Sequence, residues 1–367
     1  MKYIFDDVLE IKNGKNQKVV ENPEGKYPIY GSGGVMGFAD DYICSADTVI
    51  IGRKGSINNP IFVKEPFWNV DTAFGLETKR ELLLPKYLFY FCKKYDFEKL
   101  NKTVTIPSLT KSDILKIQID VPEMPEQENI VNRLEKIEHI IELRQEELIR
   151  FDKLIKARFV ELFGDPIINS ESLPTMPMTE VCEIIDGDRG KNYPTAEDFF
   201  DDGYCLFLNA KNVTTSGFNF DNCMFVSKEK DEALRKGKLS RGDVVLTTRG
   251  TIGNLAFYTN EVPFENVRIN SGMVILRMKQ DVVDEVYFIE QFKLQLDDIK
   301  EKIASGSAQP QLPISTMNKI QVLVPDIDRQ REFADFTKQI DKSKVAVQKS
   351  LDETQKLFDS LMQEYFG

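Results

Sequence analysis

The sequence predicts an α+β protein in which two mixed α/β globular units alternate with two long helices. One observation is a run without internal Pro or Gly, between Pro125 and Gly164, whose apolar residues recur at helical spacing. A similar run closes the chain at residues 329–367. The phrases around the two runs recur in the same order, so the chain is a duplication of one unit followed by one helix.

The first run predicts a helix over residues 126–164. Good helix formers dominate it, and its apolar positions follow steps of three, four and seven. Pro125 suits a first helical position, and Gly164 before Asp165 and Pro166 is a stop signal. At about 1.5 Å per residue this helix is about 58 Å long. The apolar positions form one stripe along the helix, called the seam below, which is expected to pack against another helix. The seam consists of Ile130, Leu134, Ile137, Ile141, Leu148, Phe151, Ile155 and Leu162.

The second run repeats the first in the same register. The offset that pairs Gly164 with Gly367 also pairs Gln127 with Gln330, Val121-Pro122 with Val324-Pro325, and residues 107–109 with 310–312. The second seam consists of Ile340, Val347, Leu351, Phe358 and Leu361.

Charged residues interrupt the two seams at different places. Arg144 and Arg158 stand where the second run has Val347 and Leu361, and Lys344 stands where the first has Ile141. Complementary interruptions predict that the two helices pair with each other. The alternative is two independent surface helices.

The chain therefore divides into four parts. These are residues 1–125 (first unit), 126–164 (first long helix), 165–328 (second unit) and 329–367 (second long helix). In the first unit we expect strands at 48–51 and 61–63, a helix from Leu84 to Leu100 and a final strand at 114–121. In the second unit residues 243–250, a helix at 285–303 and a strand at 320–324 match these elements, and residues 186–194 are additional.

Composition excludes several classes of protein. The 367 residues are 41% hydrophobic, which is enough for two cores, and no run of apolar residues is long enough to cross a membrane. The N-terminus lacks the features of a signal peptide, and five cysteines without a Cys-x-x-Cys pair are typical of reduced core residues in a cytoplasmic protein. The single histidine, His139, cannot complete a metal site with its helical neighbours, so we expect no metal.

The net charge of −11 disfavours a strong stand-alone nucleic-acid binder. It leaves room for local basic loops, and within a complex the partners can neutralise much of the DNA phosphate. A duplicated chain can place two similar modules about a pseudo-twofold axis, which suits duplex half-sites about 34 Å apart. Because the modules differ, an asymmetric bipartite site is the natural target.

The residues that could contact DNA lie on predicted turns. Arg and Lys can contact phosphate or the guanine edge, and Asn can bond adenine; each residue alone is also explained as a solvated turn residue. Asp186 and Asp188 flank Arg189 and could orient it or accept from cytosine amino groups. The candidates are Ser32, Arg53, Lys54, Asn58 and Asn59 in the first unit, and Arg189, Lys191, Asn192, Lys211, Asn212, Arg249 and Thr251 in the second.

Three enzyme motifs are incomplete. Asn59-Pro60-Ile61-Phe62 lacks the second Pro of the adenine-methyltransferase tetrapeptide, and Met36 replaces the third Gly of a dinucleotide fingerprint begun at Gly31. The sequence also lacks a phosphate-binding loop of the Gly-x-x-x-x-Gly-Lys type. We therefore expect neither a catalytic site nor a bound cofactor in this chain.

The whole chain resembles the specificity (S) subunit of type I restriction–modification systems. Asp328-Arg329 stands where the first copy has Pro125-Glu126, which is a departure from exact repetition. The phrases that carry the resemblance are 121–122 with 126–130, 324–325 with Gln330, 242–253, 186–194 and 306–312.

The resemblance implies two target-recognition domains, each reading one half of a split DNA site, and two long helices packed as an antiparallel coiled coil. It further implies two methyltransferase (modification) subunits bound to the helices, with S-adenosylmethionine on them, and restriction/translocase subunits that use ATP and Mg²⁺. Such a complex serves DNA methylation and phage defence. On this basis Arg249→Ala is expected to relax one base position at a cost of about 1–3 kcal/mol.

Two other classes stay open from the sequence. One is a non-catalytic coiled-coil scaffold with two protein-binding domains, which the acidic charge favours slightly. The other is a nuclease fused to a recognition module, which the absence of a catalytic cluster in the sequence disfavours.

Overall fold

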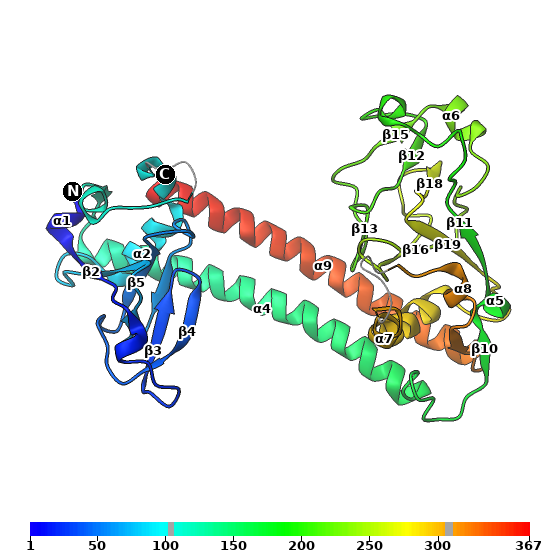
Figure 1. Cartoon of the computed structure of the whole chain (residues 1–367), viewed down its shortest axis with the longest axis horizontal. Helices are drawn as coiled ribbons and strands as arrows, with labels where there is room; N and C mark the ends of the chain where they lie inside the picture. The colour runs from blue at the N-terminus through cyan, green and yellow to red at the C-terminus, as the bar shows by residue number, and fades with distance from the viewer. Residues whose placement is uncertain (102–105, 305–310) are drawn as a thin grey trace. The chain divides into compact units, whose positions relative to one another are not determined.

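The computed structural model describes residues 1–101, 106–304 and 311–367, with side chains described outside 302–304. The chain forms two compact units. Unit 1 combines Met1–Glu147 with Val347–Gly367, and unit 2 is Leu148–Ala346. The two long helices, α4 (Met124–Phe163) and α9 (Ile327–Phe366), each contribute one part to each unit (Figure 1).

Unit 1 contains a four-stranded sheet in the order β2-β8-β5-β6, a three-stranded sheet β4-β3-β7 and the pair β1-β9. Its elements are β1 (Lys2–Ile4), α1 (Phe5–Val8), β2 (Leu9–Asn13), η1 (Gln17–Val19), β3 (Tyr27–Gly31), β4 (Gly34–Ala39), β5 (Thr48–Gly52), β6 (Ile61–Val63), β7 (Trp68–Asn69), β8 (Ala73–Thr78), α2 (Pro85–Lys94), η2 (Phe97–Leu100), α3 (Lys111–Ile114) and β9 (Gln118–Asp120). Every residue of β5 is buried, as expected of a β-branched run at the centre of a sheet.

Unit 2 repeats these sheets in the same order, as β11-β19-β16-β17, β15-β12-β18 and β10-β20, and adds the hairpin β13-β14. Its elements are β10 (Thr175–Pro177), α5 (Met178–Val181), β11 (Cys182–Asp186), η3 (Ala196–Asp198), β12 (Cys205–Phe207), β13 (Val213–Thr214), β14 (Gly217–Phe218), β15 (Phe225–Val226), α6 (Lys228–Ala233), β16 (Val244–Thr247), β17 (Leu255–Phe257), β18 (Val267–Arg268), β19 (Met273–Met278), α7 (Glu285–Ala304), α8 (Ile314–Met317) and β20 (Gln321–Leu323). The duplication predicted from the sequence is therefore present in the strand order.

Two buried glutamines hold the same junction in the two units. Gln127 accepts the N–H of Leu84 at 2.9 Å and donates to the carbonyl groups of Leu82 and Pro122, both at 2.9 Å. Gln330 has three equivalent bonds in unit 2, at 3.0, 3.1 and 2.8 Å. Both side chains are fully buried, so each glutamine ties the start of its long helix to the loop before α2 in unit 1 or before α7 in unit 2.

The long helices pack against each other inside each unit. In unit 1, Ile130 and Leu134 of α4 share a core with Phe358 of α9. In unit 2, Lys344 of α9 forms an ion pair with Asp152 of α4 at 2.7 Å, and Arg329 of α9 donates to the carbonyl of Leu162 of α4 at 2.7 Å. The contact nearer the start of α9 therefore lies nearer the end of α4. The pairing is antiparallel, so the predicted partnership is confirmed and the alternative of independent surface helices is wrong.

Two sequence predictions about shorter elements were wrong. The helix expected from Leu84 to Leu100 ends at Lys94, because Tyr95 is extended and the Asp96 carboxylate caps a separate 3-10 turn by accepting from the N–H of Glu98 at 3.1 Å. The strand expected at 114–121 is limited to Gln118–Asp120, because Thr110 caps the short helix α3 in front of it.

Candidate nucleic-acid interface

The loop after β11 fixes Arg189. Its Nη2 donates to Asp186 Oδ1 at 3.1 Å and to the carbonyl oxygen of Ser271 at 3.2 Å, while the side chain stays about half exposed. The expectation that Asp186 orients Arg189 is confirmed. The guanidinium is thus held in one place at the end of the strand and still faces solvent.

Asp188 has a structural role instead. Its carboxylate is almost completely buried and accepts the backbone N–H groups of Gly190 at 2.6 Å and Arg235 at 2.7 Å. The bond from Gly190, followed by that from Arg235, holds the pKa of Asp188 below its ordinary value even though burial opposes this. The structure shows Asp188 as a support of this loop, and a contact between Asp188 and a cytosine amino group stays a prediction.

Arg249 lies on the turn after β16. A backbone bridge joins this turn to Gln311, and the N–H of Leu312 donates to the carbonyl of Thr248 at 2.9 Å. A cavity of about 280 Å³ opens here, and both Arg189 and Arg249 line it. The structure thus brings together two candidates that are far apart in the sequence.

The equivalent turn of unit 1 carries Arg53 and Lys54. Arg53 Nη1 donates to the carbonyl of Asp71 at 3.4 Å, and its guanidinium lies 5.7 Å from the ring centre of Phe74. Ser32 lies beside this turn: a Cβ placed on Gly52 would be 3.2 Å from the Ser32 Cβ. Three of the unit 1 candidates therefore gather at one end of the sheet.

Three asparagines are engaged within the fold. Asn58 donates to Asp96 at 3.1 Å and accepts the N–H of Phe97 at 2.7 Å, and Asn192 donates to the carbonyl of Ala233 at 3.0 Å. Asn212 is fully buried, with its amide bonded to three backbone groups of its own loop. The prediction that Asn212 contacts DNA is wrong, because its side chain does not reach the surface.

Other candidates are exposed, as predicted, but do not line the cavity at Arg189 and Arg249. They are Asn59, Lys191, Lys211 and Thr251. Gln311 lines the cavity at Arg189 and Arg249 but was not among the predicted contact residues. Its only signal in the sequence was its place in the phrase at 306–312. Residues 306–310 of that phrase lie outside the described residues.

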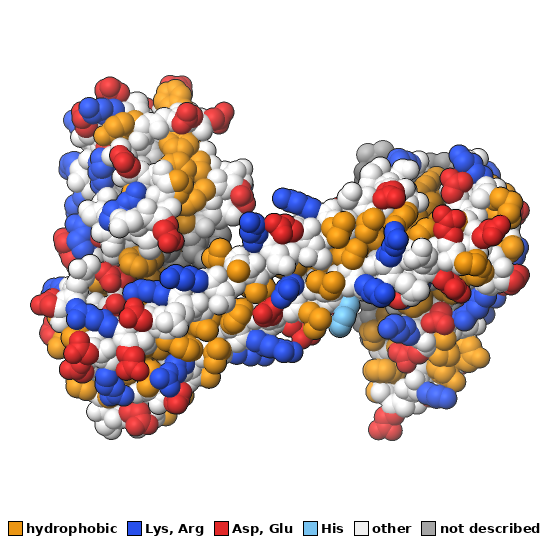
Figure 2. Space-filling model, turned by 180° about the vertical axis from the view of Figure 1, so that it is seen from behind, with side chains coloured by type: hydrophobic (Ala, Val, Ile, Leu, Met, Phe, Trp, Pro, Cys, Tyr) orange, Lys and Arg blue, Asp and Glu red, His pale blue; other side chains and the backbone are white. Residues whose placement is uncertain are grey.

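The face of the molecule that Figure 2 shows carries mixed charge. Lys and Arg side chains are interspersed with Asp and Glu on the face that Figure 2 shows, in keeping with the net charge of −11. Among the described residues, no group of three or more His, Cys, Asp and Glu could hold a metal ion, and no helix is apolar enough over a sufficient length to span a membrane. Burial raises the pKa of Cys44, Cys182 and Cys205 to about 12, so these thiols remain protonated.

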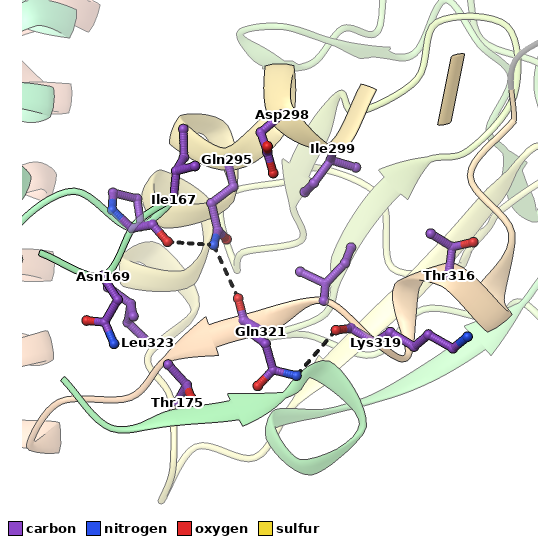
Figure 3. Close-up of a pocket in the computed structure, with 12 residues that line it drawn as sticks. Ile167, Asn169, Thr175, Gln295, Asp298, Ile299, Thr316, Lys319, Gln321 and Leu323 are labelled. Carbon is purple, nitrogen blue, oxygen red and sulfur yellow. Dashed lines mark hydrogen bonds between the residues drawn. The ribbon is translucent and has the colours of Figure 1, made fainter. Parts of the chain in front are cut away.

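A larger cavity, of about 350 Å³, lies elsewhere in unit 2 (Figure 3). Gln295 of α7 reaches across its wall and donates to the carbonyl oxygens of Pro166 and Gln321, at 3.1 and 3.2 Å. None of the predicted DNA-contact residues lines this cavity. The cationic cavity at Arg189 and Arg249 is therefore the better candidate for DNA contact.

A two-unit α+β chain with paired long helices and a cationic turn in each unit defines a class of duplicated recognition proteins. The family model described as "Type I restriction modification DNA specificity domain" matches residues 2–150 and 172–354. The chain belongs to this family. The resemblance stated from the sequence is confirmed, and with it the role of a DNA-recognition subunit.

Individual relatives are more distant. The chain is similar to the MjaVIII specificity subunit of Methanocaldococcus jannaschii, with 23% identity over 91% of this chain and 84% of the relative. The MjaIX specificity subunit of the same organism is 21% identical over 85% of this chain and 73% of the relative.

Solved structures share the fold along the whole chain. A type I restriction–modification S subunit from M. genitalium has a TM-score of 0.66 at 20% identity and covers 100% of this chain and 96% of its own. A chain from a study of type I restriction–modification complex assembly and conformational transition has a TM-score of 0.58 at 16% identity, covering 100% of this chain and 97% of its own.

Proposed function

We propose that this chain directs a type I restriction–modification complex to a bipartite DNA sequence, with unit 1 and unit 2 each reading one half. The observation that carries this proposal is that both units present cationic side chains at the same structural turn, Arg53 with Lys54 and Arg249 beside Arg189. The loops that carry these cations differ between the units, which is what two different half-sites require.

The recognition domains proper correspond in this proposal to residues 1–125 and 165–328, and the helical parts to 126–164 and 329–367. The paired helices act as a spacer, whose length sets the gap between the two half-sites. Base contacts from the turns select the sequence, and contacts with phosphate set register and orientation.

The partners in this proposal are two methyltransferase subunits, docked on the helices, and restriction/translocase subunits in the same cytoplasmic complex. Large apolar side chains exposed on the helices support such docking: Ile140 and Leu143 in unit 1, and Leu154 and Val160 in unit 2. The chain itself is non-catalytic, and S-adenosylmethionine, ATP and Mg²⁺ bind to the partners. Incubation of the isolated chain with duplex DNA and Mg²⁺ should leave the DNA intact; cleavage would contradict this part of the proposal.

The test of the bipartite model is a domain exchange. Residues 1–125 are replaced by those of a relative, the chimera is assembled with the methyltransferase subunits, and methylated adenines are located by single-molecule sequencing. One half of the recognition sequence should change and the other should stay. A change in both halves would show that the units do not read DNA independently.

A further inference from the structure

The turns after β5 and β16 are held by the same backbone bonds. In unit 1 two successive N–H groups donate to the carbonyl oxygen of Thr72, at 2.8 and 3.3 Å. In unit 2 two successive N–H groups donate to that of Gly272, at 2.8 and 3.2 Å. The equivalent pairs are therefore Arg53 and Thr248, Lys54 and Arg249, and Asp71 and Ser271.

A guanidinium lies at the same carbonyl group in both units, although different elements supply it. In unit 1 Arg53, on the turn itself, donates to the carbonyl of Asp71. In unit 2 the turn residue at that position is Thr248, which is buried, and Arg189 from the loop after β11 donates to the carbonyl of Ser271. Two loops that are not equivalent between the units thus each place a guanidinium at the equivalent backbone carbonyl group.

The other cation of each turn is unanchored. Lys54 and Arg249 are both exposed, and within the described ranges neither side chain has a hydrogen-bond or ion-pair partner. One copy uses lysine here and the other arginine. What the two share is a positive charge, while the planar fork of arginine is present in only one of them.

We infer that Arg53 and Arg189 are specificity-determining residues that each read a base edge, with guanine as the class of base, and that Lys54 and Arg249 contact phosphate. This inference rests on the proposed function and deepens it. It also reassigns Arg249, which the sequence suggested as a base contact.

The surroundings of Arg189 favour a base over a phosphate. Asp186 shares its Nη2, so a phosphate placed there would meet a carboxylate as well as a guanidinium. A base pair offers what both groups need, since guanine presents two acceptors to arginine and cytosine presents an amino group to a carboxylate. Both bonds that hold Arg189 use Nη2, so Nη1 and Nε can each still donate a single hydrogen bond to a ligand, on opposite sides of the guanidinium.

Anchoring also lowers the entropic cost of binding. A free arginine loses much of its rotamer freedom when it docks, whereas Arg189 is already fixed by two acceptors and Arg53 by a carbonyl and the face of Phe74. A fixed donor discriminates between bases by its position, whereas a mobile cation can contact phosphate at any base pair.

The test compares lysine and alanine substitutions in the chain assembled with its methyltransferase subunits. Methylation of a randomised DNA library is sequenced, and affinity for cognate DNA is measured at several salt concentrations. Arg189→Lys should keep affinity but reduce the preference at one base pair by about 5- to 150-fold. Arg53→Lys should do the same in the other half-site.

Arg249→Lys is the matched control and should leave the sequence preference unchanged. Arg249→Ala and Lys54→Ala should weaken binding at all sites alike and reduce the salt dependence by about one phosphate contact. Unchanged preference in Arg189→Lys, or a lost base preference in Arg249→Lys, would overturn the inference. A wild-type complex that methylates without sequence preference would instead overturn the proposed function itself. Thermal unfolding of each variant verifies that the fold is intact.

Discussion

Unit 1 and unit 2 share the buried glutamine at the start of each long helix but differ at the edge that carries the candidate DNA contacts. Strands β3 and β4 of unit 1 are joined by a tight turn at Ser32 and Gly33, whereas the equivalent strands β12 and β15 of unit 2 enclose the extra hairpin β13-β14. The added segment is stabilised from inside by the buried amide of Asn212. The recognition edge can therefore be rebuilt without changing the strand order beneath it.

The units also differ inside the three-stranded sheet. The strand that pairs parallel with β3 or β12 ends in Asn69 in unit 1 and in Arg268 in unit 2, and both side chains are buried. Asn69 is satisfied by neutral groups. Arg268 is paired with Asp231, which also accepts from Lys238 at 2.5 Å. Unit 2 thus depends on buried charge where unit 1 does not.

Removing the arginine tests this difference most severely. Arg268→Ala leaves Asp231, which is 1% exposed, with Lys238 as its remaining ion-pair partner, and should lower the free energy of unfolding of unit 2 by about 3–5 kcal/mol. Urea titration followed by circular dichroism measures this. The single tryptophan, Trp68, reports on unit 1 and should show an unchanged midpoint. Arg235→Ala, an exposed arginine of the same unit, serves as the control and should cost less than 1 kcal/mol.

Substitution of the buried glutamines, Gln127 and Gln330, should destabilise the two units by similar amounts. Gln127→Ala and Gln330→Ala each remove three buried hydrogen bonds and should each cost about 2–4 kcal/mol in unfolding free energy. Chemical denaturation of the two variants gives the values, with the exposed Gln145→Ala as the control. If only one of the two substitutions lowered the unfolding free energy, the two glutamines would not contribute equally to the stability of their units.

Acid should weaken unit 2 before unit 1. Burial acts to raise the pKa of Asp231, but the hydrogen bonds from Lys238 and Arg268 outweigh it and hold the pKa below 3.8. In acid the unfolded chain therefore takes up this proton more readily than the folded chain. The stabilisation is complete above about pH 4 and is lost as the pH falls through the folded-state pKa. As the pH falls, circular dichroism should show a loss of secondary structure from unit 2 before Trp68 fluorescence shows unfolding of unit 1. Loss of both signals at the same pH would contradict the prediction that unit 2 unfolds first.

The smallest effect is expected at the helix seam. Lys344 in unit 2 forms an ion pair with Asp152, where unit 1 has Ile141 in the equivalent seam position. Because the aspartate is largely exposed, Asp152→Ala should cost only about 0.2–1 kcal/mol by thermal unfolding. A cost above about 2 kcal/mol would indicate that the pair is part of the core.

The long helices were predictable because their signals are local. Pro125 and Gly164 mark the ends of a run predicted at 126–164, and the observed helix is Met124–Phe163. Gly367 and Gln330 then placed the second helix through the repeat. The seam was predicted only in part: Ile130, Leu134 and Ile155 are buried, but Phe159 and Phe163, which are fully buried, were not in the predicted seam.

The contacts of the candidate site were not predictable in the same way. Arg189 is anchored by a carbonyl 82 positions away, and Asn58 is held by a carboxylate 38 positions away. A turn composition shows that a polar side chain is near the surface, but whether its donors are already used depends on strands that the sequence pattern does not pair. Asn212 was misjudged for this reason.

The division of each long helix between the two units bears on synthesis at the ribosome. Unit 2 is one continuous segment, Leu148–Ala346, so its core can close while residues 347–367 are still in the exit tunnel. The core of unit 1 includes Phe358 and Met362, so the first part to be translated is the last to be completed. Until residues 358–362 have left the tunnel, unit 1 keeps an apolar surface open, and a chain truncated before residue 347 would have unit 2 folded and unit 1 exposed to proteolysis.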